Sequence, residues 1–317
     1  LFNGYLDFTN ETMAKGRVGV FAEGTVEGVV DLNVYDGPTE LSAKKPEVVI
    51  PFTTYDGLSR AFIIVDVETS RTYTPLWRLV LNDFSLTKIF RPNVEVEHEG
   101  VRHSSIVYDV TPLLKEGRNE LEVIHKGETP LTLNAVAVVN VYNVEKFSTR
   151  YSISAGELLI GPGESHEEAC EGECKALIKT PLDSRVRVSN GVEERFDMPG
   201  YVYEVDFTKS MRIVNESPKG FAKLFALFKL NVKTPKISVD VVKDGTKVKV
   251  RNESEVNADK LIVNVLRNGV SQVFRTFEGV GPGKEVDVSA DFSEQGNYSV
   301  RVVFSVSGFR RTFDFRL

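Results

Sequence analysis

The two cysteines are the residues whose type and spacing most directly predict chemistry. Cys170 and Cys174 lie in the stretch SHEEACEGECK, with His166 four residues before the first of them. On a helix these three side chains would share one face and could bind zinc or copper. Gly172 and the Gly-Pro-Gly at 161–163 argue against a helix, and an oxidising compartment favours a bond between the two sulfurs. We therefore expect a Cys170–Cys174 disulfide and no metal site.

A second group of ionisable residues lies in VEVEHEGVRH. Its members are Glu95, Glu97, His98, Glu99 and His103. Imidazoles and carboxylates together could hold a cation. The valines alternate with the charged residues, however, as they do on a half-exposed strand, and a glutamate-glycine pair suits a turn. We predict the charged outer face of a hairpin.

Motifs of the common enzyme classes do not occur. The sequence contains no G-x-S-x-G, H-E-x-x-H, P-loop or G-x-G-x-x-G pattern, and GVGPG at 279–283 reads as a turn. The four histidines show no spacing typical of a catalytic triad. We predict that the protein is not an enzyme, has no catalytic residues and needs no cofactor.

The single tryptophan, Trp77, lies in TYTPLWRLVL beside Tyr73. Exposed on a β-sandwich, the two rings would form a platform for a sugar. A lone tryptophan within an apolar strand is more often part of the core, and that is the reading we adopt.

Four N-x-S/T sequons predict N-glycosylation of an exported protein. Their asparagines are Asn10, Asn215, Asn252 and Asn297, of which Asn215 is the weakest because a proline follows its sequon. The isolated cysteine pair indicates the same oxidising location. Glutamine occurs twice and methionine three times, whereas charged residues abound, which is typical of hyperthermophiles. We expect a glycoprotein exported by a hyperthermophilic archaeon.

Charge and hydropathy narrow the classes of partner. The net charge is −6 with both signs interspersed, a pattern without the basic patch that nucleic acid or an anionic membrane attracts. No stretch of about 18 uncharged apolar residues occurs, so we expect no membrane insertion. The sequence starts at Leu1 without methionine, and we expect a secreted chain whose signal peptide has been removed.

Strand signals fill the sequence, and they predict an all-β protein. Short runs rich in β-branched and aromatic residues are separated by Gly, Pro, Asn and Asp. FAKLFALFKL at 221–230 is apolar on both faces and suits a buried strand as well as a helix. Asp244-Gly245 predicts a hairpin turn. The spacing favours three tandem β-sandwiches at 1–146, 147–232 and 233–317.

Two of these units resemble known families. In the last unit VKVRNESEVNADKLIVNVLRNG, GVGPGKEVDV and GNYSVRVVF follow each other as in the Ig-like, adhesion-related (CARDB-like) modules of prokaryotic surface proteins. In the first unit VLND followed by YDVTPLLKEGRNELEV resembles galactose-binding-like jelly-roll domains and their relatives in archaeal surface-layer (S-layer) proteins. The second resemblance implies a helical turn that caps one end of the sandwich with Leu113 and Leu114.

The first residues, LFNGYLDF, predict a contact with another molecule. On an extended strand Phe2, Leu6 and Phe8 share one face, and a covered apolar strand is the usual outcome. Each terminus could be a strand of its own domain, or one terminus could add to a sheet of a neighbouring copy. The C-terminal TFDFRL leaves open which end is exchanged.

Together these features predict a structural protein of the cell surface that associates with other copies of itself into a filament, sheath or lattice. Two alternatives remain: a carbohydrate-binding or cell-adhesion module that recognises a surface polysaccharide from an Ig-like spacer, and an accessory subunit of an extracellular enzyme.

Overall fold

The protein is nearly all β. The structure, a computed structural model, describes residues 15–317 except 73–75, 87–91, 293–294 and the side chain of Asp36. The described residues form 25 strands and one 3₁₀ turn at Thr111–Leu113. All strand pairs are antiparallel, so the predicted all-β class is confirmed.

The first sandwich packs two sheets around one core. Sheet I has the order β3-β9-β5-β6 and sheet II the order β2-β10-β4-β8-β7. Their strands are β2 (Gly28–Leu41), β3 (Glu47–Thr54), β4 (Leu58–Ser70), β5 (Trp77–Leu81), β6 (Phe84–Ser85), β7 (Val94–His98), β8 (Val101–Asp109), β9 (Gly117–His125) and β10 (Leu131–Asn143). The 3₁₀ turn brings Leu113 and Leu114, both partly buried, against this core.

The second sandwich recruits a strand from the start of the chain. Sheet III has the order β1-β11-β18-β13-β16 and sheet IV the order β12-β17-β14-β15. Their strands are β1 (Lys15–Val26), β11 (Ser148–Ile160), β12 (Ser165–Ala169), β13 (Glu173–Lys179), β14 (Val186–Ser189), β15 (Glu193–Phe196), β16 (Val202–Phe207), β17 (Ser210–Asn215) and β18 (Ala222–Lys233). The apolar stretch at 221–230 thus lies in a strand. Because β1 pairs with β11, the predicted unit 1–146 does not hold for its first strand.

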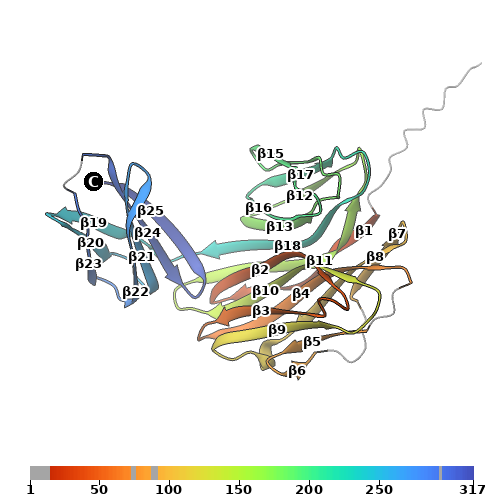
Figure 1. Cartoon of the computed structure of the whole chain (residues 1–317). Coiled ribbons are helices and arrows are strands. Elements are labelled where there is room, and N and C mark those ends of the chain that lie inside the picture. The colour runs from red at the N-terminus through yellow and green to blue at the C-terminus, as the bar shows by residue number, and fades with distance from the viewer. Residues whose placement is uncertain (1–14, 73–75, 87–91, 293–294) are drawn as a thin grey trace, which may run out of the picture.

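The two sandwiches stack into four layers, in which sheets II and III face each other (Figure 1). A separate apolar core joins them, with Phe62 and Val139 from sheet II and Ile153 and Phe225 from sheet III. Both sheets are therefore buried on both faces, and this explains the long apolar runs of β4, β10, β11 and β18.

The third sandwich follows in the C-terminal part. Sheet V has the order β22-β21-β24-β25 and sheet VI the order β19-β20-β23. Their strands are β19 (Val239–Asp244), β20 (Lys247–Asn252), β21 (Ala258–Arg267), β22 (Val270–Val280), β23 (Glu285–Ser289), β24 (Tyr298–Val306) and β25 (Phe309–Arg316). The predicted hairpin forms between β19 and β20, and Gly245 has φ +59°. The core of this sandwich also contacts Val29, Tyr142 and Phe147, at the end of the four-layer stack.

The second and third sandwiches share one architecture with a different order of strands along the chain. Sheet III without β1 (β11-β18-β13-β16) corresponds to sheet V (β22-β21-β24-β25). A common motif fixes the correspondence: Asn215 Nδ2 donates to Ile160 O over 2.9 Å, and Asn252 Nδ2 donates to Val280 O over 2.8 Å. In both cases the acceptor carbonyl directly precedes a Gly-Pro-Gly turn. Hence β11 is the equivalent of β22.

Candidate functional site

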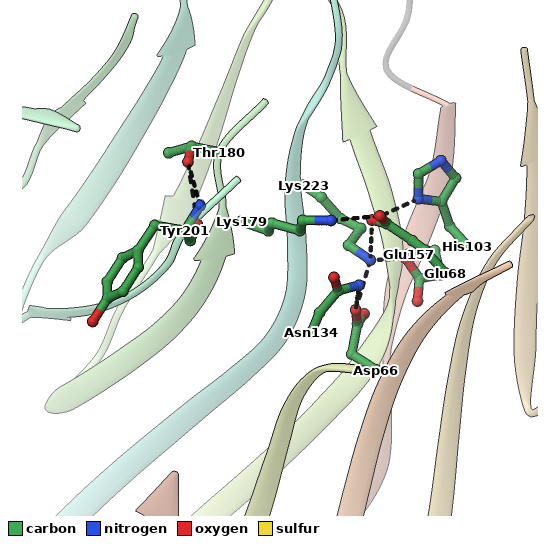
Figure 2. Close-up of polar contacts among 9 residues, drawn as sticks. All are labelled: Asp66, Glu68, His103, Asn134, Glu157, Lys179, Thr180, Tyr201 and Lys223. Atoms are coloured by element: carbon green, nitrogen blue, oxygen red, sulfur yellow. Dashed lines mark hydrogen bonds and ion pairs between the residues drawn. The ribbon is translucent and has the colours of Figure 1, made fainter. Parts of the chain in front are cut away.

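Charged side chains gather between sheets II and III, in the middle of the four-layer stack. Asp66 and Glu68 come from β4, Glu157 from β11 and Lys223 from β18 (Figure 2). Asp66, Glu157 and Lys223 are buried, with at most 2% of the side chain exposed. We call these residues, with His103, Asn134 and Lys179, the inter-sandwich charge cluster.

Lys223 lies at the centre of the cluster. Its Nζ is 2.7 Å from Asp66 Oδ1 and 3.3 Å from both Glu68 Oε1 and Glu157 Oε2. The ammonium therefore connects two carboxylates of the first sandwich with one carboxyl of the second. Buried charges are tolerated only when paired in this way, because each has lost its water.

The outer part of the cluster surrounds Glu68. His103 Nδ1 on β8 lies 3.2 Å from Glu68 Oε1, and Lys179 Nζ on β13 donates to Glu68 Oε2. Deeper in, Asn134 Nδ2 on β10 donates to Asp66 Oδ1 over 2.5 Å. Six strands of two sandwiches thus supply one continuous polar network (Figure 2).

The pKa values of the two glutamates, Glu157 and Glu68, are shifted in opposite directions. Burial raises the pKa of Glu157 well above its ordinary value, and the neighbouring Asp66 raises it further. Burial would also raise the pKa of Glu68, but Lys223, a hydrogen bond from His103 and Lys179 hold it well below its ordinary value. The environment of Glu157 therefore favours its neutral form, whereas that of Glu68 favours its charged form.

The two lysines differ in how far the carboxylates compensate for burial. Burial disfavours the charged form of Lys223, but Asp66, Glu157 and Glu68 outweigh this and raise its pKa. Burial lowers the pKa of Lys179, and Glu68 opposes the shift.

The arrangement suits mechanical coupling of the two sandwiches better than catalysis. The acid–base groups at its centre are sealed between the sheets, where a substrate would have to displace packed strands. Lys223 pairs with three carboxyl groups, and removing it leaves an uncompensated buried charge at a cost of about 3–5 kcal/mol. We interpret the cluster as a structural lock between the first and second sandwiches.

Sequence reasoning missed this cluster. It placed His103 in a surface group, whereas the structure separates that group along a hairpin of β7 and β8. Its members bond to different partners: Glu95 to Ser104, Glu97 to Arg71 and Arg102, His98 to Lys15, and His103 to Glu68. The hairpin reading is confirmed. The available signal was a charge inside an apolar run, as in AFIIVDVE and FAKLFALF.

The cysteines form the predicted disulfide. The S–S bond of Cys170–Cys174 connects the end of β12 with the start of β13, and both residues are buried. His166 instead lies 2.9 Å from Glu168 and takes no part. Over the part of the chain that the structure describes, no group of three His, Cys, Asp or Glu side chains is placed to hold a metal ion.

Two of the four predicted glycosylation sites are wrong. Asn215 and Asn252 are fully buried, and each Nδ2 donates two hydrogen bonds: to Ile160 O and Gly220 O, and to Val256 O and Val280 O. A glycan on either nitrogen would break these bonds and has no space. Their sequons are structural, since each Asn Oδ1 also accepts from the N–H of the sequon serine.

Of the other candidate functional residues, the structure describes Asn297 and Trp77. Asn297 is exposed, so its glycosylation stays a prediction. Asn10 and the association residues Phe2, Leu6 and Phe8 lie outside the described residues, as does Tyr73. Trp77 is 5% exposed and packs in the first core, so the core reading is confirmed and Trp77 offers no sugar platform.

Two findings bear on where the protein is located. None of the described helical residues forms a segment of the length and apolarity that crossing a bilayer requires. The disulfide is compatible with an extracellular location.

Comparison with known proteins gives no family. No family model and no curated protein matches the chain. The β-glucuronidase of Ruminococcus gnavus is similar over 51% of this chain and 35% of that chain, at 13% identity and a TM-score of 0.19. Its complex with D-glucuronic acid gives 12% identity, 36% of that chain and the same TM-score. The chain thus spans about a third of that enzyme, and so low a TM-score supports no functional inference.

Proposed function

We propose that this protein is a structural component of an extracellular surface, in a hyperthermophilic archaeon, and that its copies associate into a filament, sheath or lattice. The joint is the apolar N-terminal segment, residues 1–9, which adds as a strand to a neighbouring copy. Other copies of the chain are therefore its principal partners.

One observation carries this proposal: β1 is the outermost strand of sheet III, paired only with β11 among the described strands. The segment with Phe2, Leu6 and Phe8 is continuous with this edge strand. Unpaired strand edges are templates for further strands, and the apolar residues that precede β1 in the sequence are the segment that we propose for this role.

The energetics suit a stable joint. A strand of about eight residues gains main-chain hydrogen bonds worth about 0.5–1.5 kcal/mol each. Burial of Phe2, Leu6 and Phe8 contributes about 1.5–3 kcal/mol for each side chain. Because association costs about 4–15 kcal/mol, a stable joint needs most of these hydrogen bonds and all three side chains together.

The contacts between the three sandwiches support a structural role. The three cores are joined by the inter-sandwich charge cluster and by the contact of the third sandwich with Tyr142 and Phe147. A polysaccharide-binding module, the alternative, loses its main argument because Trp77 is buried. Asn297 remains available for a glycan on the surface.

The test compares the whole chain with a variant that starts at residue 10. Sedimentation velocity and electron microscopy of the full chain should show polymers whose fraction rises with protein concentration, and the shortened variant should sediment as a monomer. A full chain that stays monomeric at high concentration overturns the proposal. Polymers of the shortened variant would place the joint elsewhere.

A further inference from the structure

The equivalence of the second and third sandwiches identifies a vacant strand position. In the second sandwich β1 covers the edge of β11, with Lys15 opposite Leu159 and Val26 opposite Thr149. In the third sandwich β22 is the equivalent of β11, and its only strand partner among the described residues is β21. The third sandwich therefore lacks the strand that β1 supplies to the second.

The correspondence extends to the residue pairs at the ends of β11 and β22. Ile160 pairs with Ala222, and Val280 pairs with Ala258. Both pairs lie beside the buried asparagine motif, whose second Nδ2 bond ends two residues before each alanine. Because the two sheets share this backbone arrangement, a further strand can pair with the free edge of β22 as β1 pairs with β11.

The edge of β22 exposes apolar side chains. Phe274 is 56% exposed and Val270 is 64% exposed, on a strand of 11 residues. A long edge with exposed apolar residues is the kind of edge that proteins normally cover. The other exposed valine of this sandwich, Val242, lies on β19 in the opposite sheet.

The occupant is a second copy of this chain. Figure 1 shows the start of β1 and the third sandwich at opposite ends of the molecule, so the point at which residues 1–14 join β1 is far from the β22 of the same copy. The residues before Lys15 include the alternating apolar set of Phe2, Leu6 and Phe8.

We infer that residues 1–9 of one copy pair antiparallel with the free edge of β22 in the next copy and make sheet V a five-stranded sheet, as β1 does for sheet III. This inference rests on the proposed function and names its acceptor. Because the start of β1 and the edge of β22 lie at opposite ends, such a contact is head-to-tail and generates an open polymer.

The test changes the acceptor edge and leaves the donor intact. Phe274→Asp should raise the protein concentration needed for assembly about tenfold or more, because a large apolar side chain at the joint is replaced by a charge. Val242→Asp is the matched control, since Val242 is as exposed but lies on the other sheet, and it should assemble like the wild type. Circular dichroism melting verifies that both variants fold.

A second measurement gives the contact directly. With Cys170 and Cys174 already paired, Leu6→Cys and Phe274→Cys in one chain should form intermolecular disulfides upon assembly, whereas Leu6→Cys with Val242→Cys should not. Assembly that depends on residues 1–9 but is unaffected by Phe274→Asp and gives no such crosslink overturns this inference and leaves the proposed function standing. A full chain without assembly overturns both.

Discussion

The ammonium group of Lys223 lies 2.7 Å from Asp66 Oδ1, although the two residues are 157 positions apart and belong to different sandwiches. This ion pair closes the interface between sheets II and III. Because both side chains are buried, each needs the other as a partner when the first and second sandwiches pack on each other.

We expect Lys223→Met to lower the free energy of unfolding by about 3–5 kcal/mol, because Asp66 then stays buried without its cation. Guanidinium denaturation at neutral pH measures the effect. Lys247→Met is the control: Lys247 pairs with Asp287 over 3.1 Å on the surface, and its loss should cost no more than about 1 kcal/mol. Equal effects of the two variants would show that the cluster does not hold the sandwiches together.

Glu157 gives the protein a specific pH dependence. Its pKa is raised in the folded state, so the folded protein keeps a proton that the unfolded chain releases near the ordinary value of 4.5. The stability from the protonated group is full below that value and is lost as the pH rises toward the folded-state pKa. Glu157→Gln, which keeps a neutral side chain, should therefore lose less stability than the wild type as the pH rises above the ordinary value of 4.5.

The free energies of unfolding of the wild type and Glu157→Gln should diverge by at most about 1.4 kcal/mol per pH unit, because only one titrating group differs. Denaturation curves of both proteins at several pH values provide the measurement. The pH dependence that Glu68 contributes is opposite: because its pKa is lowered in the folded state, its stabilising effect is present above the ordinary value and is lost on acidification through the folded-state pKa. Parallel pH profiles of the wild type and Glu157→Gln would refute a protonated Glu157.

The buried asparagines should be essential to the fold. Asn252→Ala deprives the carbonyls of Val256 and Val280 of their donor, and we expect a loss of about 2–4 kcal/mol. Asn297→Ala changes an exposed residue and should stay within about 0.5 kcal/mol of the wild type. Thermal melting compares the two variants.

Glycosylation should follow the same division. In native material, mass spectrometry of proteolytic peptides should find a glycan on Asn297 and unmodified asparagine at 215 and 252. A glycan on Asn252 in folded protein would be incompatible with the hydrogen bonds described above.

The Cys170–Cys174 disulfide should contribute modestly to the free energy of unfolding. Mass spectrometry of unreduced protein should show Cys170 and Cys174 linked, with two hydrogens fewer than the reduced chain. The closed loop is short, and chain entropy gives about 2 kcal/mol for its closure. Reduction should thus lower the melting temperature without unfolding the protein, and an unchanged melting temperature would show that the bond does not constrain the unfolded chain.

The sequence by itself determined the features that depend on neighbouring residues. Alternation and turn residues predicted the strands, Asp244-Gly245 predicted the β19–β20 hairpin, and the four-residue spacing of Cys170 and Cys174 allowed their disulfide. Such features are local, because backbone preference, turn geometry and chain entropy over a few residues decide them.

Only the tertiary structure decided which strands meet. The pairing of β1 with β11, across more than a hundred residues, follows from burial in the core between sheets II and III. The sequons at Asn215 and Asn252 look like glycosylation sites until folding buries them, and Lys223 looks like a break in an apolar strand until Asp66 lies opposite it. A sequence pattern fixes what each residue needs, whereas packing of distant strands decides which partner satisfies that need.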